Sequence, residues 1–245
     1  MVINPNLPLL EAVVERLGKL SEHMVFVGGC AVGLLVTDPA APCLRVTHDV
    51  DVLVEVATLA GYHRLSEELR RCGFNEDMDE GAPICRWRTA EVVLDVMPTE
   101  PSILGFGNRW FEPAYSAAKI YILSSGKQIR LPTAPFLLAT KFEAFDFRGE
   151  RDYLLSRDME DIVSVLDGRP EIMAEVHHAD NPLRLYLAQR FASLLETRNF
   201  FEALPGLLPP DAASQSRATL IINRIESMAR TSQKGAGREI TPAPF

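Results

Sequence analysis

The sequence predicts an α/β protein of the α+β kind, with a mixed and mostly antiparallel sheet flanked by helices and an all-helical C-terminal part. Strand-like apolar runs occur only before about residue 132, and the chain beyond it has the apolar spacing of helices. With 245 residues, 47% of them hydrophobic, the chain is long enough to bury a large core. We expect a first domain over residues 1–132, a helical domain over 133–230 and a mobile tail over 231–245.

Helices and strands alternate in the first part. Leucines and valines at helical spacing predict a helix near the N-terminus, and a longer helix is expected from Thr58 to a stop at Gly73. A short helix is expected over 30–36, an acidic surface turn over 75–81 and a loop over 98–113. The apolar runs predict strands, the last four of them in two hairpins, at 25–27, 50–56, 84–89, 91–97, 118–123 and 127–132.

The pattern changes to helix at Thr133. A cap-type threonine with a proline two residues later predicts a helix that ends at Gly149. A second helix is expected to end at Gly168, and the rest of the chain to about residue 230 has helical spacing, broken by prolines over 205–210.

Composition excludes several classes of protein. The formal net charge of −8 argues against a broad basic surface for nucleic acid, although it is compatible with a local basic patch. No run approaches the ~18 apolar residues of a membrane span, and the N-terminus lacks the pattern of a secretory signal. The four cysteines have no metal-ligand spacing and are expected to be free thiols. We therefore expect a cytoplasmic protein with no membrane partner.

The stretch from Val25 to Val54 contains the first candidate site. A strand ends in Gly28-Gly29, and a later strand opens with Asp49-Val50-Asp51. Side chains at i and i+2 of a strand point to the same face, so two carboxylates would lie together and repel unless a cation binds them. Carboxylate oxygens suit Mg²⁺ or Mn²⁺. Taken separately, the glycines also fit an ordinary turn, and the aspartates fit a solvated strand end.

Asp95 is the third candidate carboxylate. It lies within the apolar run 91–97, where an ionised side chain is costly without a partner. One interpretation is a third metal ligand, delivered by the neighbouring strand to Asp49 and Asp51. The other is an aspartate at a strand end that is bonded to backbone amides.

A second group of charged residues lies in the helical part. Lys141 and Arg148 fall on one helix face, and Asp158 and Asp161 fall three residues apart, again on one face. A solvated, ion-paired surface accounts for such charges equally well, so Lys141 is expected on a polar face.

The combination of Gly28, Gly29, Asp49 and Asp51 resembles the signature of the polymerase-beta-type nucleotidyltransferase superfamily, with glycine where some members have serine. The resemblance implies a nucleotidyltransferase-like sheet, and it implies that Asp95 is the third metal ligand. The segment KFEAFDFRGERDYLLSRDMEDI is similar to the AbiEii-type abortive-infection toxins, whose likeness covers about Val25 to Leu166. Lys141 matches their nucleotide-contacting lysine, and their final motif is matched by Arg157, Asp158 and Asp161.

The resemblance implies transfer of a nucleoside monophosphate from a nucleoside triphosphate to a hydroxyl acceptor. Asp49, Asp51 and Asp95 would hold two Mg²⁺ or Mn²⁺ ions. The backbone at Gly28-Gly29 would approach the triphosphate, and Lys141, oriented by Asp158 or Asp161, would add a point charge on it. Two alternatives remain at this stage, a small-molecule antibiotic nucleotidyltransferase and a non-catalytic nucleotide-binding module.

The toxin-like relatives suggest RNA as the acceptor, with the 3′ end of tRNA as one candidate, and an antitoxin protein as a partner. An RNA acceptor is held largely through phosphates, so basic residues are expected along one rim of the cleft. Trp87 and Trp110 lie among the basic candidates and could stack on bases or serve as core aromatics. The candidates are Arg86, Arg88, Arg109, Lys119, Lys127 and Arg130.

Overall fold

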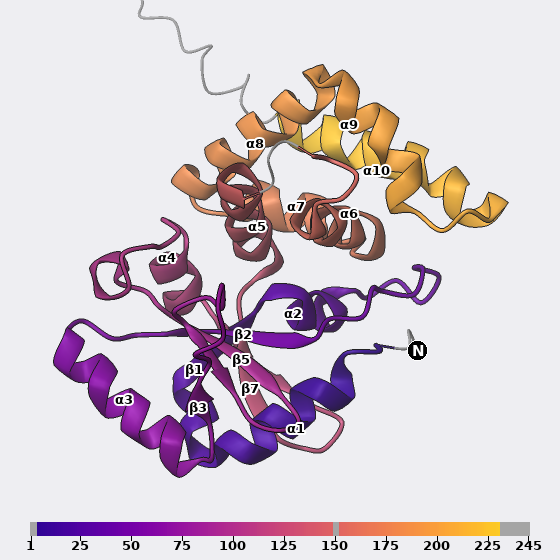
Figure 1. Cartoon of the computed structure of the whole chain (residues 1–245). Helices are drawn as coiled ribbons and strands as arrows, with labels where there is room; N and C mark the ends of the chain where they lie inside the picture. The colour runs from indigo at the N-terminus through magenta and orange to yellow at the C-terminus, as the bar shows by residue number, and fades with distance from the viewer. Residues whose placement is uncertain (1–3, 149–151, 231–245) are drawn as a thin grey trace, which may run out of the picture.

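Seven strands form one mixed sheet in the first half of the chain (Figure 1), as seen in a computed structural model that describes residues 4–148 and 152–230. The strand order is β3-β4-β5-β2-β1-β7-β6. The pairs β1–β7 and β2–β5 are parallel and the other four are antiparallel, which confirms the expected mixed and mostly antiparallel sheet. The strands are β1 Met24–Val27, β2 Asp49–Val54, β3 Asn75–Glu76, β4 Arg86–Arg88, β5 Val93–Pro98, β6 Lys119–Ile122 and β7 Gln128–Leu131.

Helices cover the sheet. On one face, α1 (Leu7–Leu17) and α3 (Leu59–Arg71) pack against alternate strand side chains such as Phe26 and Trp87. The helix α3 begins after Thr58, as expected, and the Thr58 side chain caps it by accepting a hydrogen bond from the Gly61 amide. The helix α2 (Gly28–Leu35) contributes Cys30 and Ala31 to this same core. On the opposite face, α4 (Phe111–Ser116) packs against Val25 and Leu53. Two short 3-10 turns complete this half, η1 Gly18–His23 and η2 Pro101–Ile103.

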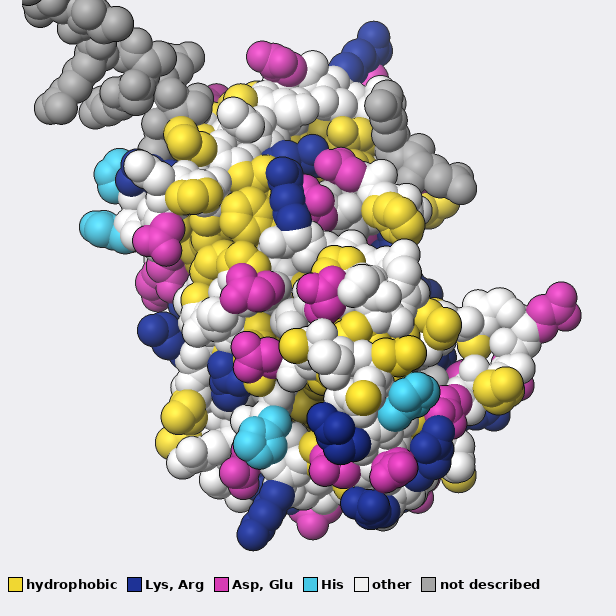
Figure 2. Space-filling model, turned by 90° about the vertical axis from the view of Figure 1, so that its left-hand side faces the viewer, with side chains coloured by type: hydrophobic (Ala, Val, Ile, Leu, Met, Phe, Trp, Pro, Cys, Tyr) yellow, Lys and Arg dark blue, Asp and Glu magenta, His cyan; other side chains and the backbone are white. Residues whose placement is uncertain are grey.

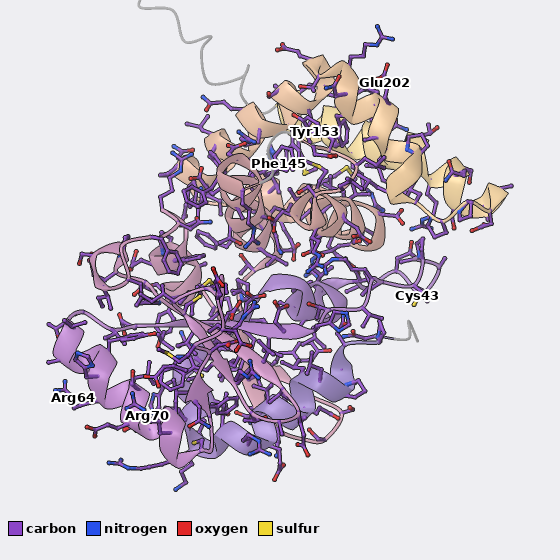
Figure 3. The ribbon with its side chains drawn as sticks, viewed as in Figure 1. Cys43, Arg64, Arg70, Phe145, Tyr153 and Glu202 are labelled. Carbon is purple, nitrogen blue, oxygen red and sulfur yellow. The ribbon has the colours of Figure 1, made fainter. Side chains whose placement is uncertain are left out.

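The second half of the described chain contains only helices and connecting turns, which confirms the all-helical part (Figure 1). Ser156 caps the helix that carries the second charged motif, and Asp211 caps the last helix. Aromatic side chains such as Phe145 and Tyr153 pack together in this half (Figure 3). The centroids of these two rings lie 4.9 Å apart. The helices are α5 Ala134–Arg148, α6 Arg157–Gly168, α7 Ile172–His178, α8 Asn181–Glu196, α9 Arg198–Ala203 and α10 Ala212–Ala229, with a 3-10 turn η3 at Leu204–Leu207.

The helix α2 joins the two halves. Its residues Val32 and Leu35 belong to the same apolar core as α5 and α6. The amides of Thr37 and Asp38 both donate to the carbonyl of Gly168 at 2.9 Å. A Cβ at Gly168 would lie 2.7 Å from a methyl group of Val36, so the close approach of α6 to this segment needs a glycine. The two halves are therefore held together by direct packing.

Three local expectations were wrong. The helix α2 begins at Gly28 and not after the glycines, so both glycines lie in its first turn. The acidic turn contains the short strand β3, and the expected loop over 98–113 ends inside α4. The expected helix stop Gly149 and the expected tail over 231–245 lie outside the described residues.

Two expectations about the chain as a whole can be compared with the structure. No helix in the described ranges 4–148 and 152–230 is long and apolar enough to cross a membrane. All four cysteines are free thiols, as expected.

Candidate active site

Three carboxylates lie together on the sheet face that is turned towards the helical half. The parallel register of β2 and β5 places Asp51 directly beside Asp95. Asp49 lies two residues before Asp51 on the same strand and therefore on the same face. Asp95 lies inside β5 and is 7% exposed, so the interpretation of a strand-end aspartate is wrong. The structure thus brings together the three acids that the sequence singled out.

The Asp51 carboxylate occupies the space that a side chain at position 28 would fill. The glycine has a φ of +67°, in the left-handed region, at the start of α2. A Cβ at this position would lie 1.8 Å from Oδ2 of Asp51. The first turn of α2 therefore presents bare backbone to the acids, with no side chain between them.

The negative charge of the Asp51 carboxylate is poorly offset by the groups around it. Burial and the negative charge of Asp49 together raise its pKa to about 7, against the opposing charge of Lys141. Within the described part of the chain, no donor makes a hydrogen bond to this carboxylate. A half-buried carboxylate in this state is stabilised by a proton or by a cation.

Arg86 lies between the other two acids. Its Nε and Nη2 donate to the two oxygens of Asp95 at 2.8 Å each, and Nη2 also lies 3.1 Å from Oδ2 of Asp49. The hydroxyl of Thr47 donates to the other oxygen of Asp49 at 2.9 Å. Among residues 4–148 and 152–230, no three His, Cys, Asp or Glu side chains are grouped so that they could hold a metal ion as they stand.

Lys141 is buried in the cleft, and the expectation that it lies on a polar face was wrong. Its exposed fraction is 7%, and its Nζ lies 2.6 Å from Oδ2 of Asp161 and 3.0 Å from Oδ1 of Asp158. Burial works to lower the pKa of Lys141, but the charges of Asp161 and Asp158 outweigh it and raise the pKa to about 12. Both aspartates of the second motif thus contact the lysine.

Two arginines complete this network. Arg148 binds both oxygens of Asp158, at 2.9 and 3.0 Å. Arg45 binds both oxygens of Asp161, at 2.9 Å each. Each aspartate is therefore held by one bidentate arginine and by the shared ammonium of Lys141, which fixes the lysine at the wall of the cleft.

Two adjoining cavities open at these residues. The larger, of about 570 Å³, is lined by charged groups from both halves, including the three acids and Arg86. The smaller, of about 270 Å³, has apolar walls to which Phe106, Phe111 and Phe147 contribute. The cavities share four residues of the two charged groups: Asp51, Lys141, Arg148 and Asp158.

Sequence reasoning missed the roles of several residues. Arg45 lies in the loop between the two motifs, where spacing gave no signal. Arg86 was expected at an RNA-binding rim, although its place opposite Asp95 in an antiparallel hairpin could have indicated the pair. Arg148 shares a helix face with Lys141, and this shared face was the available signal that Arg148 also pairs with Asp158.

The expected basic rim was wrong. Arg86 and Arg88 belong to β4, near one end of the sheet, and the hairpin β6–β7 forms the other end. These basic residues therefore do not gather on one rim. Several are already paired with acids, as Arg109 is with Glu143 at 2.7 Å. On the face that Figure 2 shows, basic and acidic side chains are interspersed. Both tryptophans are buried, so the interpretation as core aromatics is confirmed for Trp87 and Trp110.

Comparison with known proteins gives distant structural likenesses. No protein-family model matches the sequence, and no curated protein is similar to it. The solution structure of the antibiotic-resistance factor ANT(2'')-Ia has a TM-score of 0.48 at 14% identity, over 78% of this chain and 95% of that one. JHP933 from Helicobacter pylori has a TM-score of 0.47 at 13% identity, over 94% and 92%.

A third solved structure, a nucleotidyltransferase from H. pylori by its description, has a TM-score of 0.48 at 14% identity, over 94% of this chain and 96% of that one. At this distance, the function of the chain has to be argued from its own residues.

Proposed function

We propose that this chain is a metal-dependent nucleotidyltransferase that moves a nucleoside monophosphate from a nucleoside triphosphate to a hydroxyl acceptor. One observation carries the proposal: Asp49, Asp51 and Asp95 share one sheet face beside the bare backbone of Gly28, with Lys141 buried across the same cavity. The acceptor hydroxyl forms a bond to the α-phosphorus, the bond between the α- and β-phosphates breaks, and pyrophosphate leaves.

The residues present fit a divalent cation. The donor set is three carboxylates, the hard oxygen ligands that Mg²⁺ and Mn²⁺ prefer. Asp51 has no hydrogen-bond donor among the described residues, and burial and the charge of Asp49 raise its pKa; a bound cation would offset both effects. Asp49, Asp51 and Asp95 would hold the ion. Bound there, it would neutralise phosphate charge and make the acceptor hydroxyl a better nucleophile.

The chain's own groups can bind and orient the phosphates. At the first turn of α2, Gly28 and Gly29 bring no side chain of their own, and a helix N-terminus favours anions. Lys141 and Arg148 lie where the two cavities meet, and Arg157 is an exposed cation in the wall of the larger one. Asp158 and Asp161 keep the Lys141 ammonium in one position, so its charge is pre-organised.

The smaller cavity supplies an apolar surface next to the acids. Its phenylalanines and Met97 suit a planar ring, such as a nucleobase or a ring of the acceptor. Phe147 stands at this cavity with an exposed fraction of 88%, so its ring is available to a bound molecule. A charged cavity for phosphates joined to an apolar one for a ring matches the two ends of a nucleotide.

The toxin-like branch, an RNA acceptor and an antitoxin partner remain part of the proposal through the sequence resemblance around Lys141, Asp158 and Asp161. A small-molecule antibiotic acceptor is the second candidate. It is favoured by one observation, since the expected basic rim for RNA is absent among the described residues. We keep the division near residue 132 as the proposed boundary between a catalytic and a helical domain.

Transfer of label from an α-³²P nucleoside triphosphate tests the proposal. Each of the four triphosphates is incubated with the enzyme and with total cellular RNA, or with an aminoglycoside or lincosamide, with and without Mg²⁺ or Mn²⁺. We expect a labelled acceptor that requires the metal and is lost in Asp51→Asn. Asp77→Asn, an acid paired with Arg88 outside the cleft, is the matched control. Labelling that is unchanged in Asp51→Asn would reject the site.

A further inference from the structure

Arg86 occupies the place that a cation would take between two of the three acids. Its guanidinium binds Asp95 in a bidentate manner and also donates a hydrogen bond to Asp49, so one positive charge contacts both carboxylates. Such bidentate, charge-assisted pairs are among the strongest hydrogen bonds in proteins. The guanidinium thus offsets one of the two negative charges of Asp49 and Asp95 without any ion.

Arg86 lies near the end of the sheet and in the wall of the larger cavity. It belongs to β4, which is separated from the end of the sheet only by the two-residue strand β3. Its side chain is 26% exposed and lines the larger cavity, in which phosphates would bind. A guanidinium that leaves Asp49 and Asp95 therefore has an anionic partner within the same cavity once a triphosphate is bound.

We propose that Arg86 is an internal counter-ion that competes with the divalent cation for Asp49 and Asp95, so that metal and nucleotide bind together and neither binds well alone. This inference rests on the proposed nucleotidyl transfer. In the free enzyme Arg86 occupies Asp49 and Asp95 and weakens metal binding. When metal and triphosphate enter together, the metal takes the carboxylates and Arg86 transfers to the phosphates.

Arg88 provides a matched control within the same strand. It lies two residues from Arg86 and therefore on the same face of β4. It is also paired with two aspartates, but these are Asp77 and Asp79 on the surface, outside the acid site. Arg88→Gln removes the same charge from the same strand face and leaves Arg86 in contact with Asp49 and Asp95.

The test measures Mn²⁺ binding by electron paramagnetic resonance, with and without a non-hydrolysable triphosphate analogue. Wild type should bind Mn²⁺ weakly alone and at least about tenfold more tightly with the analogue. Arg86→Gln should bind Mn²⁺ about tenfold more tightly than wild type without the analogue, gain little from it, and bind the analogue itself more weakly. Arg88→Gln should behave as wild type.

A second measurement covers the case in which Arg86→Gln is unstable. Without its counter-ion the acid cluster repels itself, so Mn²⁺ should raise the melting temperature of Arg86→Gln more than that of wild type. Arg86→Lys, which keeps the charge and loses the bidentate contact, should lie between them. Equal or weaker Mn²⁺ binding by Arg86→Gln, in an enzyme that still transfers label with Mg²⁺, would overturn only the role of Arg86. No Mn²⁺ binding by wild type with the analogue would overturn both proposals.

Discussion

The Asp51 carboxylate lies against the backbone of Gly28, so closely that a Cβ at position 28 would stand 1.8 Å from Oδ2 of Asp51. This contact joins the two sequence motifs, since the glycine begins α2 and the aspartate lies on β2. A side chain at position 28 cannot be accommodated without moving the acid. The left-handed φ of Gly28 adds a second reason why only glycine fits.

Gly28→Ala should therefore abolish transfer and lower the free energy of unfolding by at least about 1–2 kcal/mol, the cost of a left-handed alanine. Gly29→Ala is the control. Its Cβ would meet the end of the flexible Arg45 side chain at 2.8 Å, which can shift, and its φ is not left-handed. Urea unfolding and labelling assays of both variants measure the difference. Equal effects of the two substitutions would contradict this role of Gly28.

Lys141→Ala should destabilise the fold, because Lys141 is buried between two carboxylates. Removal of one partner from a buried ion pair costs about 3–5 kcal/mol. We expect the lower end, about 3 kcal/mol, since Asp158 and Asp161 each keep a bidentate arginine. Lys119→Ala, on the exposed edge strand β6, should change stability by less than about 0.5 kcal/mol. Urea unfolding that shows no difference between the variants would place Lys141 outside this network.

The Lys141 network should also make the protein sensitive to acid. Burial works to raise the pKa of Asp158, but Lys141 and Arg148 outweigh it and hold the pKa below its ordinary value of 3.8. The ionised form therefore contributes stability that is present above pH 3.8 and is lost as the pH falls through the lower folded value. Asp158→Asn lacks this contribution, so its deficit relative to wild type should be large at pH 6 and smaller at pH 3. A constant deficit in urea unfolding across this range would contradict the shift.

Arg157→Ala should weaken triphosphate binding without harming the fold. Arg157 is exposed at the start of α6 and lines the charged cavity, so one phosphate contact is expected to depend on it. The loss of one charge-assisted contact should raise KM for the triphosphate about tenfold. Arg198→Ala, which removes an exposed arginine from α9 on another surface, should leave KM unchanged. An unchanged KM in Arg157→Ala would remove this residue from the site.

The sequence was sufficient for most of the fold because its signals are local. Apolar runs bounded by turns located six of the seven strands, and the change of spacing at Thr133 located the helical half. The strand β3 was missed because two exposed polar residues leave no apolar pattern. Asp51 and Asp95 could be joined because adjacent strands in one sheet bring their side chains together.

Pairs that depend on the packing of the two halves could not be predicted in this way. Arg45 reaches Asp161 across 116 positions of the chain, and no periodicity connects a loop arginine with a distant helix. Lys141 was expected on a polar face because helical spacing shows which residues of a helix are polar. It does not show which face of the helix another helix covers. Burial of that face becomes visible only when α6 packs against α5.

The last prediction concerns the acceptor. If it is RNA, labelling should weaken as salt rises, because each phosphate contact with a single strand contributes about 0.7 to the slope of log affinity against log salt. The slope should be shallow, since the arginines near the cleft are mostly paired with carboxylates, as Arg148 is with Asp158.

Labelling of cellular RNA at about 50 mM and about 200 mM salt, the span over which phosphate contacts become measurable, provides the test. Arg157→Ala should lower the slope by about 0.7, the contribution of one phosphate contact. Arg130→Ala should leave it unchanged, because Arg130 lies on β7, donates to the carbonyl of Tyr115 and stacks on its ring. A small antibiotic carries no chain of phosphates and predicts almost no salt dependence. Labelling of an aminoglycoside or lincosamide with no labelled RNA at either salt concentration would overturn the RNA acceptor and leave the acid site and its chemistry in place.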